Sequence, residues 1–151
     1  MQNVFDAKDA QEYINRINNL TPETQRKWGK MSVNQVLAHL NVAYDLTFMP
    51  EKFPKPSFIA KFLLSRFVKP KITNEIPYKQ SLPTSPAFII ADERNFEEEK
   101  AKLIGNIQRV QQLGREAFEG KENINFGKMT AQCWNNMFAK HLNHHLDQFG
   151  V

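Results

Sequence analysis

The distribution of proline is the feature that most constrains how this chain can fold. Seven of the eight prolines lie between Pro50 and Pro86. Proline lacks a backbone donor and interrupts both helices and central strands, so this stretch is expected to run as short pieces. The flanking stretches, 1–49 and 87–151, contain only Pro22, and their apolar residues recur at helical spacing. The distribution of proline and the helical spacing of apolar residues therefore predict long helices on both sides of one irregular connection.

Length and composition indicate one globular domain spanning residues 1–151. The chain is 41% hydrophobic and 24% charged, which is ordinary for a domain of this size. Its single cysteine, Cys133, has no intramolecular disulfide partner, and we expect it to be a small buried hydrophobe. The first residues lack the pattern of a signal peptide, and no uncharged run is long enough to span a membrane. We therefore expect a cytoplasmic protein.

The fold class predicted is all-α, a four-helix bundle with a long proline-rich crossover connection that carries a short extra helix. Ser32 and Gln35 form a capping box that opens the second long helix. The extra helix is expected at 57–68, and a polar loop at 120–129 should precede the final helix. The four principal helices are predicted near residues 7–19, 33–49, 93–113 and 130–149.

The net charge of +4 is concentrated in residues 50–90, which hold seven basic and two acidic side chains. The basic residues are spread along a proline-rich stretch rather than interleaved with aromatics, so we expect no nucleic-acid partner. The segment is instead expected to form one wall of a pocket for a small anionic molecule. The 57–68 helix also suits a membrane interface. We expect it to dock on the bundle, and hence expect no membrane binding.

Three of the four histidines fall within five residues near the C-terminus. His141 and His145 are four residues apart, so both imidazoles lie on the helix face that carries Trp134 and Phe138. His39 lies within the apolar arc of the second long helix. Two inward-facing helices can thus bring three imidazoles to one divalent metal ion with a fourth position open. The alternative is that these are core histidines bonded to backbone carbonyls.

No carboxylate accompanies the three histidines in the sequence. Leu142 stands where a zinc protease of the His-Glu-x-x-His type would place its general base, so that chemistry is disfavoured. No catalytic residue is assigned, and His144 is expected to lie outside the metal's ligand set. We expect Trp28 and Trp134 to be core anchors. The side chains expected to support the ligands are Gln148, His144 and Tyr44.

The segments WGKMSVNQVLAHLNVAY and WNNMFAKHLNHHLDQFG, with the proline-broken connection between them, resemble the DinB/YfiT-like superfamily. More narrowly, they resemble a bacterial DinB-related domain family of unknown function. The resemblance implies a four-helix bundle that holds a divalent metal through a histidine triad, here His39, His141 and His145. Some members of the superfamily look like thiol S-transferases or isomerases that use low-molecular-weight bacterial thiols.

Several functions remain open at this point. The first is a metal-dependent enzyme, with zinc or nickel as the expected ion, that transfers a small thiol or hydrolyses a small anionic substrate. The second is a non-catalytic bundle in which the metal or the histidine cluster is structural. The third is a peripheral membrane or partner-binding protein that uses the 57–68 helix. The oligomeric state is also open, and a homodimer is one option.

Overall fold

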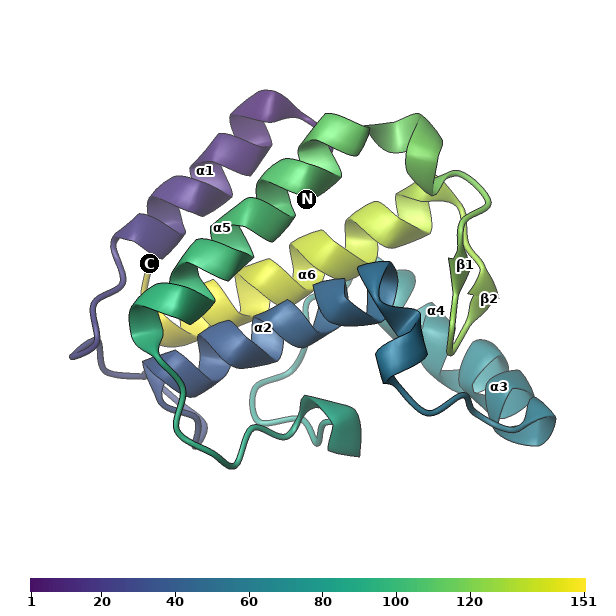
Figure 1. The fold of residues 1–151 in the computed structure, drawn as a ribbon, viewed down its shortest axis with the longest axis horizontal. Helices are drawn as coiled ribbons and strands as arrows, with labels where there is room; N and C mark the ends of the chain where they lie inside the picture. The colour runs from purple at the N-terminus through teal and green to yellow at the C-terminus, as the bar shows by residue number, and fades with distance from the viewer.

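The computed structural model describes residues 1–151 and is mainly helical, as predicted, with one small two-stranded sheet. Two of the long helices, α1 and α2, each lie against both of the other two, α5 and α6 (Figure 1). One apolar core fills the space between them. The four long helices are α1 (Ala7–Asn18), α2 (Val33–Phe48), α5 (Phe96–Leu113) and α6 (Ala131–Phe149).

Side-chain caps explain where the long helices begin. The capping box of Ser32 and Gln35 is confirmed at the start of α2, with both of its hydrogen bonds present. The side chain of Asn95 accepts a hydrogen bond from the backbone of Glu98, and α5 therefore begins at Phe96, a few residues after the predicted start. α6 ends at Phe149 and is followed by Gly150, which adopts the left-handed conformation typical of a helix C-terminus.

Aromatic side chains on α6 form the centre of the core. Trp134 and Phe138 are both fully buried and stack on one another, with ring centroids 5.7 Å apart. Phe118, from the short turn after α5, packs edge-on against both rings. The face of α6 that carries His141 and His145 is therefore anchored by its own preceding turns.

The connection, residues 49–95, contains more helix than the sequence predicts. A helical segment runs through α3 (Phe58–Leu63), a π-helical turn (Leu64–Val68) and α4 (Lys69–Thr73). The Lys69 N–H bonds to the carbonyl of Leu64, so the widened turn lies just before Pro70. Pro70 then falls in the first turn of α4, where its missing donor costs nothing. Further 3₁₀ turns lie at Pro50–Lys52 and Pro86–Phe88.

The stretch 120–129 is a hairpin rather than the loop that the sequence predicts. Strands β1 (Glu122–Asn123) and β2 (Gly127–Lys128) pair antiparallel. The Asn123 side chain accepts hydrogen bonds from the backbone of Asn125 and Phe126, which builds the turn. Strands of two residues are too short to show alternation, so the sequence pattern misses them.

None of the helices combines the length and the apolar character that crossing a membrane would require.

Candidate metal centre

The structure brings His39, His141 and His145, here called the histidine triad, together between α2 and α6. One ring nitrogen from each lies within 4.8 Å of the others. The Nε2 atoms of His39 and His141 are 2.9 Å apart, and the ring centroids of the three pairs are 4.6 to 5.0 Å apart. The pairing follows from the packing of α2 against α6.

The connection orients His39. Its Nδ1 lies 2.8 Å from the backbone carbonyl of Phe88, in the 3₁₀ turn Pro86–Phe88. A carbonyl only accepts, so Nδ1 carries the proton and the neutral ring keeps its lone pair on Nε2. The Phe88 ring also packs edge-on against His39 and His141, covering the triad. A bond of this kind is what the alternative of a core histidine predicts, but a backbone carbonyl has no signature in sequence, so the sequence could not indicate Phe88 as the partner.

A chain of hydrogen bonds orients His145. Its Nδ1 lies 2.8 Å from Oε1 of Gln148, whose Nε2 donates to the carbonyl of Trp28 at 2.8 Å. The amide is thereby fixed, Nδ1 donates to it, and the Nε2 lone pair of His145 is free. Gly29 makes room for this contact: it has a φ of +81°, and a Cβ there would collide with the Gln148 amide. Gln148 thus connects His145 to the backbone before Gly29, and its predicted role in supporting a metal ligand stays a prediction.

Burial keeps the triad neutral. It lowers the pKa of His39, and it lowers the pKa of His141 well below the usual value. The pKa of His145 falls to about 3, mainly through burial and secondarily through repulsion from His39. Since His39 presents a lone pair at Nε2, His141 donates its Nε2 proton across the 2.9 Å contact. Metal binding by His141 would therefore release or relocate that proton.

The donor set fits a borderline divalent cation. Three nitrogens at ~2.0–2.1 Å from a tetrahedral ion lie ~3.3 Å apart, a small expansion of the His39–His141 contact. Neutral imidazoles suit zinc, nickel or copper rather than magnesium or calcium. The cluster contains only histidines, so a bound ion would keep its full charge. The type and spacing of the nitrogen atoms are thus compatible with the prediction that the three histidines bind a divalent metal.

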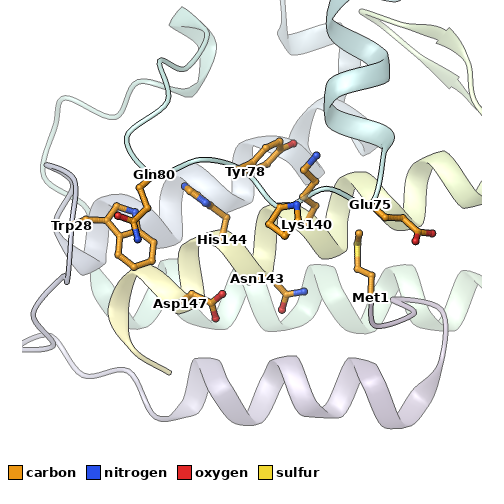
Figure 2. A pocket seen from close by; sticks show the side chains of 10 residues that line it. Met1, Trp28, Glu75, Tyr78, Gln80, Lys140, Asn143, His144 and Asp147 are labelled. Atoms are coloured by element: carbon orange, nitrogen blue, oxygen red, sulfur yellow. The ribbon is translucent and has the colours of Figure 1, made fainter.

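A pocket of about 440 Å³ lies beside the triad, between α6 and residues 75–80 of the connection (Figure 2). His144 lines this pocket and packs its ring against His145, with centroids 4.9 Å apart. Tyr78 and Trp28 pack edge-on against the other sides of His144. His144 therefore connects the pocket to His145 of the triad and lies outside the three-histidine cluster.

The charges in the pocket differ from the prediction. The connection forms one wall, through Glu75, Tyr78 and Gln80, but none of its lysines or arginines lines the pocket. The cation there is Lys140 of α6, which donates to the Lys71 carbonyl and lies 4.4 Å from the centroid of the Tyr78 ring. Lys140 was not among the residues predicted for the site, although it stands directly before His141 in the sequence.

Three further expectations are corrected. Trp28 is a partly exposed residue of the pocket rather than a core anchor, whereas Trp134 is fully buried as expected. Tyr44 stacks on Phe138 in the core, its pKa raised by burial, and makes no hydrogen bond to the triad. Cys133 is half-buried. Helical periodicity gives the face of the helix on which Tyr44 or Cys133 lies. Which residues each side chain contacts, and how far it is buried, depends on the neighbouring helices.

Fold and site together define a mainly helical protein with a cluster of three histidines, two of them buried and His141 half-buried, next to a pocket. The chain belongs to the family described as protein of unknown function, DUF1569, whose model matches residues 2–150. None of the curated proteins and none of the solved structures matches the chain.

Proposed function

We propose that this protein is a divalent-metal-dependent transferase that acts on a small thiol and an electrophilic partner. His39, His141 and His145 are the metal ligands, with zinc or nickel as the ion. The observation that carries the proposal is the convergence of three neutral imidazoles, two of which are turned by Nδ1 hydrogen bonds so that Nε2 faces the cluster. Such second partners are typical of histidines that bind metals.

Because no carboxylate belongs to the histidine cluster, a substrate that carries its own acidic proton is favoured. A bound divalent cation would supply a positive charge that lowers the pKa of a thiol and favours the thiolate, the competent nucleophile. A thiol brings its own acidic proton and needs only a weak base nearby. His144 is that base: burial lowers its pKa, so it is neutral at pH 7, and it stands between pocket and triad.

The pocket favours a small thiol that carries charges of both signs. Lys140 offers a cation, while Glu75 and Asp147 offer carboxylates on the same rim (Figure 2). Trp28 adds an aromatic wall to the pocket.

The proposal includes membership of the DinB/YfiT-like superfamily and its four-helix bundle type. What supports it is the histidine in the second long helix together with the His-x-x-x-His pair near the C-terminus. A reducing, cytoplasmic location in a bacterium agrees with thiol chemistry and with the single cysteine.

Cobalt substitution tests the proposal directly. Tag-free protein is loaded with cobalt and titrated with a panel of low-molecular-weight thiols, because a thiolate bound to cobalt adds an intense charge-transfer band. We expect the band with thiols that also carry amino and carboxylate groups. The His144→Gln variant should keep the cobalt spectrum but need a higher pH for the band to form. If thiols leave the spectrum unchanged while simple anions alter it, the thiol proposal fails and hydrolysis takes its place. Indifference to both classes indicates a structural metal.

A further inference from the structure

The helical segment of the connection turns its large apolar side chains to the outside. Six of the eleven exposed large hydrophobic residues of the protein lie within residues 58–68, and Phe58 alone is 88% exposed. Scattered exposed apolar residues are normal, but a contiguous set marks an interaction site. We call this set the apolar face: Phe58, Ile59, Phe62, Leu63, Phe67 and Val68.

Polar contacts hold the segment in this orientation. Lys61 forms a 2.7 Å ion pair with Glu122 of the hairpin, and Nζ of Lys69 donates to the carbonyl of Lys128 at 2.8 Å. Both lysines thus contact the hairpin, and Lys61 also borders the apolar face, where it lines a shallow hollow together with Phe58 and Phe62. A helix that packed for burial alone would be rotated the other way. In Figure 1, α3 lies at one end of the molecule, beyond the four long helices and beneath the hairpin.

The charged side chains of the segment itself have one sign, whereas acidic residues flank it at Glu51 and Glu75 and meet it at Glu122 of the hairpin. Residues 52–74 include six basic side chains and no acidic one. Lys61 and Lys69 face the hairpin, and the remaining four, Lys52, Lys55, Arg66 and Lys71, are exposed. The Arg66 guanidinium lies 5.6 Å from the centroid of the Phe67 ring, at the edge of the apolar face. Aromatic and aliphatic side chains bordered by cations are typical of helices that lie at an anionic lipid surface.

We propose that the apolar face docks on the surface of an anionic phospholipid bilayer. Its side chains enter the boundary between headgroups and acyl chains, while the four exposed cations contact lipid phosphates. A second copy of the chain fits less well, because pairing the faces would bring the two sets of cations together. The sequence led us to expect no membrane binding, because the 57–68 helix was expected to dock on the long helices. The residues of the apolar face are instead exposed. The inference is independent of the proposed thiol chemistry.

Vesicle co-sedimentation of the full chain tests the inference. The probe is a vesicle of phosphatidylcholine mixed with phosphatidylglycerol, compared with pure phosphatidylcholine. We expect binding to the anionic vesicles only, and release at ~1 M salt, where charges are screened beyond ~3 Å. The double variant Phe58→Ser with Phe62→Ser should lower binding by about tenfold or more, since it removes two inserted rings. Lys55→Glu with Arg66→Glu should release the protein.

Matched controls separate the outcomes. Leu113→Ser replaces a leucine that is as exposed as Leu63 but lies on α5, and it should leave vesicle binding unchanged. Absence of binding to anionic vesicles, or equal binding to neutral ones, overturns the proposal. Sedimentation velocity addresses the competing occupant: a dimer that Phe58→Ser with Phe62→Ser dissociates, without vesicle binding, assigns the face to a second copy.

Discussion

Two helical regions of this protein carry similar apolar stripes and orient them in opposite ways. α6 turns Trp134 and Phe138 into the core, where both are fully buried. The segment 58–68 turns Phe58 and Phe62 to the outside. An amphipathic pattern therefore shows that a helix has an apolar face, but the neighbouring elements decide whether protein covers it. In this molecule the covered stripe leads to the histidine triad, and the uncovered one forms a separate surface.

Truncating one phenylalanine in each region should give the largest difference in the free energy of unfolding. Phe138→Ala is expected to lower the free energy of unfolding by about 3–5 kcal/mol, because it removes a buried ring and leaves a cavity. Phe58→Ala should change it by no more than about 0.5 kcal/mol, since the ring is exposed. Urea denaturation of the metal-free protein measures both. A loss above ~2 kcal/mol from Phe58→Ala would mean that the apolar face is covered in solution.

The stability of the protein should depend on pH through the histidine triad, which lies next to the buried apolar stripe of α6. The triad histidines have folded pKa values below the ordinary value of 6.5, so below pH 6.5 the unfolded chain binds more protons than the folded one. Metal-free protein should therefore lose stability as pH falls from 7 toward 5, by up to about 1.4 kcal/mol per pH unit for each histidine. Denaturation at several pH values gives the slope. Replacing all three by glutamine should flatten it, and an unchanged slope would assign the effect elsewhere.

Replacing one metal-binding histidine should strongly weaken metal binding and leave the apolar face unchanged. His141→Ala and His145→Ala are each expected to weaken metal binding by more than about 100-fold, because only two imidazoles remain. His144→Ala should change it little. Metal content of dialysed, tag-free protein measures the effect, and vesicle binding should be equal in all three variants. Equal metal loss from all three replacements would contradict the assignment of the ligands.

The hydrogen bonds behind the ligands should have smaller effects. Gln148→Leu removes the acceptor for His145, and Gly29→Ala displaces the Gln148 amide. Each is expected to weaken metal binding by about 10–100-fold while leaving one site per chain. Gly105→Ala is the matched control, since a Cβ at this exposed helical position meets nothing within 4 Å. Affinity equal to the control would show that the amide does not orient the ligand.

The long helices and the triad were predictable because their signals are local. Caps such as Ser32 with Gln35 act within one turn, and proline marks the connection through its own missing donor. The spacing of His141 and His145 places both on one face of any helix that contains them, and His39 shares the apolar arc of its own helix. Local geometry thus sufficed to nominate three imidazoles, although their function as metal ligands stays a prediction.

Contacts between distant residues decided the rest. The Phe88 carbonyl reaches His39 across 49 positions, and Gln148 reaches Trp28 across 120. Backbone carbonyls look alike in every sequence, so no pattern could reveal these partners. The outward turn of residues 58–68 likewise involves distant contacts, such as the pair of Lys61 with Glu122 of the hairpin, which lies 61 positions along the chain. Periodicity defines the two faces of a helix, but only packing against distant elements selects which of them meets solvent.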